Sequence, residues 1–104
     1  MAITVQVEFL SVATVRVVAY VEDDDEDLTD PTAVTLDIYD PDGTKQVDDA
    51  AMVQSTTGIY EYYYHQGAGE DAMDTGRWRG EVRTADGTGA STKYSAKAFS
   101  FKVI

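Results

Sequence analysis

Hydrophobic and polar residues alternate along most of this chain. The alternation is clearest between positions 58 and 83, where two stretches carry an aromatic or apolar residue at every second position: Tyr60, Tyr62, Tyr64, Trp78 and Val82. Successive side chains of a β-strand point to opposite faces of its sheet, so this spacing predicts strands that bury one face in a core. Tyr63 lies on the other phase, and we expect it to point outward.

Shorter alternating stretches bounded by turn residues complete the pattern. The predicted strands span residues 3–9, 15–21, 34–38, 45–47, 51–54, 58–65, 76–83 and 94–103. Asp40-Pro-Asp-Gly43 predicts a tight turn after the third of them. Lys97 shares the phase of the apolar positions that follow it, so we expect a bulge at residues 97–98 that shifts the register. No stretch favours a helix of useful length. The predicted fold class is therefore all-β, a single antiparallel sandwich of about seven strands.

The composition fits one domain spanning residues 1–104, because hydrophobic residues make up 43% of the chain. The chain has no cysteine, which excludes a disulfide, a thiolate metal site and a thiol nucleophile. No apolar run approaches the ~20 residues of a membrane helix, and residues 1–7 lack the features of a secretory signal. We expect no membrane insertion and favour a virion or the cytoplasm as the location. Whether the chain is a full gene product or an excised domain stays open.

Charge narrows the choice of ligands. The net charge is −11, which argues against a nucleic-acid partner because phosphates need basic contacts. Seven of the 19 acidic residues fall in residues 22–30. Asp23, Asp25 and Asp27 alternate there and could bind Ca²⁺, with Asp86 as a further ligand. The alternative is a charged loop that keeps the domain soluble. A second acidic group is expected at the opposite end of the domain: Asp40, Asp42, Glu70, Asp71 and Asp74.

The sequence offers little for catalysis. His65 is the only histidine. Glu61 shares its strand face but lies about 13 Å away along an extended strand, too far for a direct pair. No spacing indicates a Ser-His-Asp arrangement. We expect a protein that is not an enzyme.

Three local motifs carry a resemblance to a known fold family. They are the strand at 33–39 followed by Asp40-Pro-Asp-Gly-Thr44, the segment Gly58-Ile-Tyr-Glu-Tyr62, and Asp74-Thr-Gly-Arg-Trp78. Together they resemble the immunoglobulin-like or fibronectin type III-like β-sandwich domains of bacterial and phage structural proteins. The third motif is similar to the Asp-x-Gly-x-Tyr corner of such domains, with Trp78 in place of the tyrosine. An indole has no hydroxyl, so we expect the backbone bond of that corner to be missing.

The same resemblance implies a surface for a protein partner. The strand at 58–65 would pair with the strand at 13–22. The outer face of that sheet would then carry Val18, Tyr20, Ile59 and Tyr63. Clustered apolar and aromatic side chains on a solvent face suit a partner surface, although cross-strand packing that only stabilises the sheet is the alternative. The other sheet is expected to carry a polar, solvated face on which Asp37 meets Arg79 or Arg83.

The predicted function is a non-enzymatic structural or protein-interaction module that binds a protein partner or a second copy of itself. The resemblance implies a phage or virion component. Two alternatives stay open. One is a ligand-binding module that takes Ca²⁺ through residues 22–30 or a carbohydrate through exposed aromatic side chains. The other is an accessory domain of a larger secreted protein.

Overall fold

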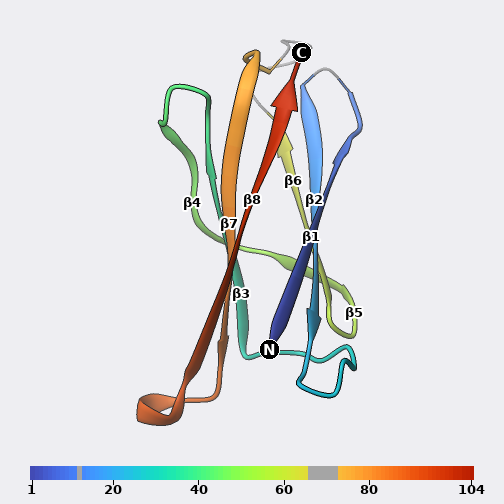
Figure 1. Cartoon of the computed structure of the whole chain (residues 1–104), viewed down its shortest axis with the longest axis vertical. Helices are drawn as coiled ribbons and strands as arrows, with labels where there is room; N and C mark the ends of the chain where they lie inside the picture. The colour runs from blue at the N-terminus through green and yellow to red at the C-terminus, as the bar shows by residue number, and fades with distance from the viewer. Residues whose placement is uncertain (12, 66–72) are drawn as a thin grey trace.

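Two four-stranded antiparallel sheets face each other in the computed structural model (Figure 1). The first sheet has the order β1-β2-β6-β5 and the second the order β4-β3-β7-β8. The strands are β1 (Ala2–Phe9), β2 (Thr14–Glu22), β3 (Ala33–Tyr39), β4 (Lys45–Ala51), β5 (Val53–Thr56), β6 (Ile59–His65), β7 (Gly76–Asp86) and β8 (Lys93–Val103). The structure describes residues 1–11, 13–65 and 73–104. The predicted all-β sandwich is confirmed, with eight strands among the described residues in place of about seven.

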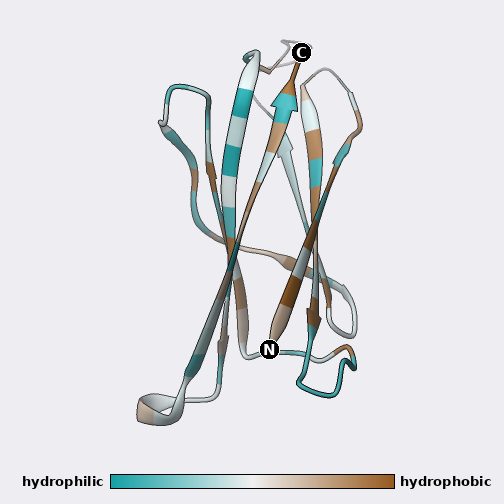
Figure 2. Cartoon of the chain, in the orientation of Figure 1, coloured by the Kyte–Doolittle hydropathy of each residue, from teal (hydrophilic) through white to brown (hydrophobic). Residues whose placement is uncertain are grey.

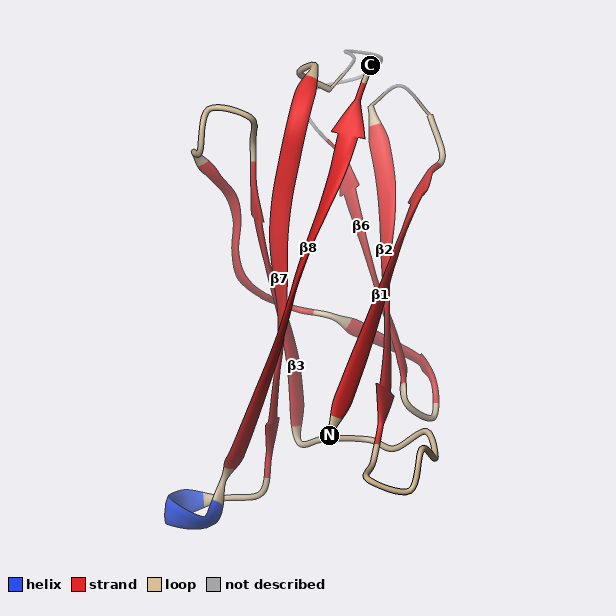
Figure 3. Cartoon of the chain, in the orientation of Figure 1, coloured by secondary structure: helices blue, strands red, loops and turns tan. Residues whose placement is uncertain are grey.

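Helical structure in these ranges is confined to one 3₁₀ turn, η1 (Gly89–Ser91), between β7 and β8 (Figure 3). No helix in the described part of the chain is long and apolar enough to cross a membrane. Glu70 and Asp71, which we predicted at one end of the domain, lie outside the described residues.

The core lies between the sheets and is built from the inward phase of each strand. Residues with no exposed surface include Val15, Val17, Val21, Leu36, Ile38, Trp78 and Val82. Figure 2 shows the resulting alternation of hydrophobic and hydrophilic bands along β2. Trp78 stacks on Phe101 with ring centroids 5.9 Å apart and meets Tyr64 at 5.8 Å. Each aromatic pair of this kind adds about 0.5–1.5 kcal/mol beyond the burial of its area.

Trp78 also has a backbone partner. Its indole Nε1 donates to the carbonyl oxygen of Asp74 at 2.9 Å. The bond that we expected to be missing is therefore supplied by an N–H group in place of a hydroxyl. It ties the start of β7 to the chain four residues upstream.

The two sheets approach each other at both sides of the sandwich. On one side β1 and β8 lie next to each other and run in the same direction (Figure 1). On the other side the chain crosses from β4 in the second sheet to β5 in the first through Met52. This residue is buried, and its N–H donates to the carbonyl oxygen of Val34 at 3.0 Å. The crossing places β5 beside β6, which matters for the surface described below.

The tyrosines of β6 point alternately into the core and outward, as the sequence pattern predicts. β2 pairs with β6, with Ala19 opposite Tyr60 and Val15 opposite Tyr64. Tyr60 and Tyr64 are buried, and Tyr62 packs against the core while partly exposed. Tyr63 points outward and keeps 55% of its surface exposed.

The bulge predicted at residues 97–98 is wrong. β7 and β8 pair in unbroken register from Gly76 opposite Val103 to Asp86 opposite Lys93. Lys97 follows the inward phase of an edge strand, yet it is exposed. A long side chain at a sheet edge can reach water between the two sheets, and an inward-pointing charge there also discourages pairing with another strand.

The register shifts lie between β3 and β4 instead. Leu36 pairs with Ala50 and Ile38 with Val47, so Asp37 faces both Asp48 and Asp49. Such a bulge bends the edge strand away from a regular ladder.

Candidate functional site

The predicted partner surface lies on the outer face of the first sheet, but the residue at the centre of that face is buried. Val18 points outward but keeps only 3% of its surface exposed. Gln6 and Glu61 lie directly opposite it on the two neighbouring strands. Arg16 and Tyr20 lie two positions away on the same strand, so four long side chains surround the valine. Val18 is therefore a buried packing residue that offers almost no surface to a partner, whereas Tyr20 and Ile59 are partly exposed.

Hydrogen bonds hold the side chains that cover Val18. The Arg16 guanidinium donates to Glu61 Oε2 through Nε at 2.9 Å and Nη2 at 2.7 Å. The hydrogen bond to Glu61 is the main reason why the pKa of Arg16 lies above its usual value. Tyr20 Oη donates to Gln6 Oε1 at 3.4 Å. These pairs bridge β2 to both of its neighbours and make the centre of the face polar.

Exposed apolar surface gathers at the edge of this sheet. Val53 of β5 is 65% exposed and lies opposite Glu61 of β6. Tyr63 follows Glu61 by two residues, so it lies on the same face of the sheet as Val53. Val53 and Tyr63 line a shallow hollow together with Ala51, Glu61 and Tyr62. We define the edge surface as Val53 and Tyr63. The sequence pattern identified Tyr63 but not Val53, because four residues of an edge strand do not fix its phase.

An aspartate that the sequence reading counted only as loop charge positions β6. Asp30 Oδ1 accepts the backbone N–H of Gly58 at 2.7 Å, the side-chain amide of Gln54 at 2.8 Å and Tyr60 Oη at 3.3 Å. The bond from Gly58 is the main reason why the pKa of Asp30 is lowered. Gly58 has φ +72°, and a Cβ there would lie 2.7 Å from the Cβ of Leu28. Only glycine fits this close approach, which fixes where β6 begins.

The predicted Ca²⁺ ligands do not converge. Asp23 Oδ1 accepts the backbone N–H groups of Asp25 at 2.9 Å and Asp27 at 3.1 Å, so its carboxylate shapes the loop. No group of three or more His, Cys, Asp or Glu residues in the described ranges could hold a metal ion. Asp86 does lie at the same end, where it shares a hollow with Asp23 and the cationic Lys93.

One of the carboxylates expected at the other end, that of Asp40, has structural contacts. Asp40 Oδ1 accepts the N–H groups of Asp42 at 3.0 Å and Thr44 at 2.9 Å, which forms the predicted turn. Its Oδ2 accepts the side-chain amide of Gln46 at 2.9 Å. Burial opposes ionisation of Asp40, but these hydrogen bonds outweigh it and lower the pKa.

Asp37 is buried, although we expected it on a solvated face. Its Oδ1 accepts the N–H of Asp49 at 2.6 Å, and its Oδ2 accepts Arg83 Nη1 at 2.6 Å. Arg83 also donates to Asp49 Oδ1 at 2.9 Å. Burial alone would raise the pKa of Asp37, but the bonds from Asp49 and Arg83 outweigh it and lower the pKa. The predicted pairing with Arg83 is confirmed, and it braces the bulge of β4.

The two residues considered for catalysis have separate partners. His65 Nδ1 and Thr14 Oγ1 are 2.6 Å apart, a hydrogen bond that joins the ends of β2 and β6. Glu61 is engaged by Arg16, as described above.

Comparison of the chain with protein-family models, with curated proteins and with solved structures gives no match. The resemblance to immunoglobulin-like domains stays a prediction. The architecture of this protein is a β-sandwich.

Proposed function

We propose that this chain is a non-enzymatic module that works by protein–protein contact, and that the contact is centred on the edge surface, Val53 and Tyr63. The observation that supports it is the joint exposure of these two side chains, 65% and 55%, on adjacent strands. Single exposed hydrophobic residues are common, but neighbouring ones beside a polar rim are typical of interfaces.

The surroundings suit such a contact. Tyrosine is enriched at the centres of interfaces, because it offers a large apolar area and a polar tip at a small entropy cost. Tyr63 lies on β6, which is paired on both sides and anchored at its start by Asp30. The Arg16–Glu61 pair beside it supplies a polar rim. A role as a phage or virion structural component rests on the three sequence motifs alone.

A double variant tests the proposal. Val53→Thr with Tyr63→Gln removes the apolar surface while keeping β-compatible shapes at solvent positions, so the fold should persist. Tyr94→Gln is the matched control, because Tyr94 is 78% exposed on β8 of the other sheet. We expect the double variant to lose about tenfold or more in affinity, and Tyr94→Gln to bind as the parent does.

The readouts are sedimentation for self-association and quantitative binding to a partner recovered with the immobilised parent protein. A double variant that stays folded and matches the parent in both measurements would show that the edge surface is not the contact.

A further inference from the structure

Some basic residues of this acidic protein form ion pairs with carboxylates and others do not. Arg16, Lys45 and Arg83 each have a carboxylate partner within 4 Å. In the part of the chain that the structure describes, no such ion pair involves Arg77, Arg79 or Lys102, which we define as the cationic patch. All three are exposed on the outer face of the second sheet. Arg77 lies opposite Lys102 across β7 and β8, and its Nη1 donates to the neutral Ser100 Oγ at 3.1 Å.

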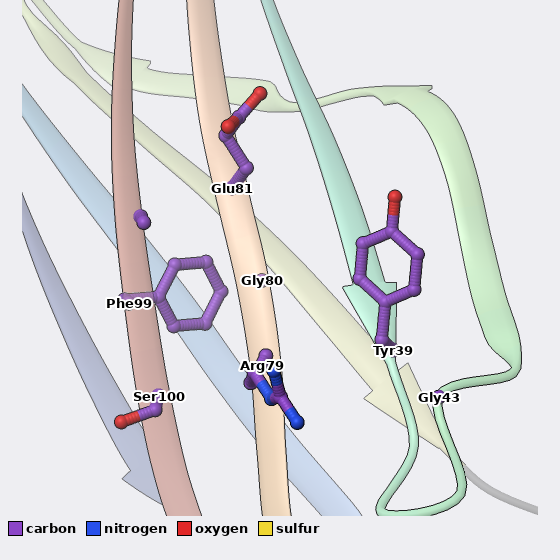
Figure 4. A pocket seen from close by; sticks show the side chains of 8 residues that line it. Tyr39, Gly43, Arg79, Gly80, Glu81, Phe99 and Ser100 are labelled. Carbon is purple, nitrogen blue, oxygen red and sulfur yellow. The ribbon is translucent and has the colours of Figure 1, made fainter.

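A hollow in the sheet face lies beside this patch (Figure 4). Arg79 and Glu81 border it from β7, and Tyr39 borders it from β3. Ala98 and Ser100 of β8, whose side chains are small, also line it. The face therefore combines cations that form no ion pair among the described residues with a recess of a size for a short loop.

The same chain carries a segment of opposite charge. Asp25, Glu26 and Asp27 are exposed at the tip of the loop after β2. The Asp23 carboxylate holds the backbone of this tip. The tip is therefore a preformed acidic projection. Because folding has already ordered it, binding would cost little further conformational entropy.

The two features lie at opposite ends of the molecule. The loop after β2 is at the foot of Figure 1, whereas β7 begins and β8 ends at the head. Figure 2 shows the hydrophilic colour of both regions. The molecule is 42 Å long, so the tip cannot reach the patch of its own chain. A second copy can bring them together.

We propose that the cationic patch binds residues 23–27 of a second copy in a head-to-tail contact. Such a contact joins two different surfaces, so it leaves a free patch at one end and a free loop at the other. It therefore propagates into open chains unless the geometry closes a ring. This contact uses neither Val53 nor Tyr63, so its failure would leave the proposed function standing.

Charge sets the conditions under which the contact forms. The net charge of −11 makes two copies repel at long range. At about 0.15 M salt the Debye length is about 8 Å, which screens whole-molecule repulsion over 42 Å but spares charges in close contact. At about 1 M salt it falls to about 3 Å, and the contact is lost as well. Association should therefore peak at intermediate ionic strength.

Charge reversal at each side tests the contact. Arg79→Glu with Lys102→Glu reverses the patch, and Asp25→Lys with Asp27→Lys reverses the tip while leaving Asp23 in place. The control is Lys97→Glu, which reverses one charge near the middle of β8, outside both the patch and the tip. The average mass is followed by sedimentation and light scattering against protein concentration.

We expect the parent and the control to show a mass that rises above 11.4 kDa with concentration at intermediate salt. Each reversed variant alone should stay monomeric, because like charges then face each other. An equimolar mixture of the two reversed variants should associate again, because every patch then meets a loop of opposite sign. A parent that stays monomeric at every salt, association that survives either reversal, or a mixture that stays monomeric would overturn the proposal.

Discussion

Thr84 places a polar hydroxyl group in an apolar environment. It lies on the inner face of β7 and is 2% exposed, and its Oγ1 has no hydrogen-bond partner among the described residues. A buried hydroxyl without a partner costs about 1–3 kcal/mol in the free energy of unfolding, because it has given up its bonds to water.

Thr84→Val replaces that hydroxyl by a methyl group of the same shape. We expect it to raise the free energy of unfolding by about 1–2 kcal/mol, measured by urea denaturation. Thr35→Val is the control, because Thr35 points outward and is partly exposed, and it should change stability by less than about 0.5 kcal/mol. A Thr84→Val variant that is no more stable than the parent would mean that the hydroxyl has a partner after all.

Val18 shows what single-residue reasoning from sequence can and cannot reach. The alternation correctly places its side chain on the outer face. Its burial depends on Arg16, Tyr20, Gln6 and Glu61, which meet around it only when three strands are in register. The hydrophobic pattern of one strand does not show which long side chains of the neighbouring strands will cover it.

At the scale of elements, the strands could be predicted because alternation and turn residues mark them. The pairing of residues 58–65 with residues 13–22 followed from the fold resemblance and not from the alternation. The bulge could not be placed correctly. Lys97 breaks the hydrophobic pattern of β8, but an edge strand can hold a lysine on its inner phase without a register shift. The bulge of β4 leaves no break in hydrophobicity, because its extra residues Asp48 and Asp49 are as polar as their neighbours.

The bulge of β4 depends on an ionised Asp37, and this makes stability depend on pH. Asp37 has a lowered pKa in the fold against 3.8 ordinarily, so the fold favours its charged form. The stabilisation is complete above the unfolded value and is lost as pH falls through the lower folded value. We expect the free energy of unfolding to fall from about pH 4 downward.

Asp37→Asn separates this contribution from the rest. At neutral pH it should cost about 1–3 kcal/mol, less than a fully buried ion pair, because Arg83 stays 37% exposed. Between pH 7 and pH 3 the variant should lose less stability than the parent, since it has one carboxyl fewer to protonate. Urea denaturation at both pH values gives the comparison. Equal acid losses in the two proteins would refute the role given to Asp37.

At the scale of the whole molecule, charge is arranged in a way that the net value hides. Lys102 lies beside Arg77 and Arg79 only because β7 pairs with β8. A net charge of −11 therefore coexists with three neighbouring cations at one end and an acidic tip at the other. The edge surface arises in the same way, from a chain crossing that brings β5 beside β6. Surfaces of this kind need the topology as well as the pattern.

If Tyr63 lies at the contact, its environment should change when the protein meets its partner, whereas the environments of Tyr60, Tyr64 and Tyr94 should not. Hydroxyl-radical footprinting of the free and associated states measures this directly. We expect Tyr60 and Tyr64 to be protected in both states and Tyr94 to react in both. Tyr63 should react in the free state and become protected on association. A Tyr63 that reacts equally in both states would contradict this expectation.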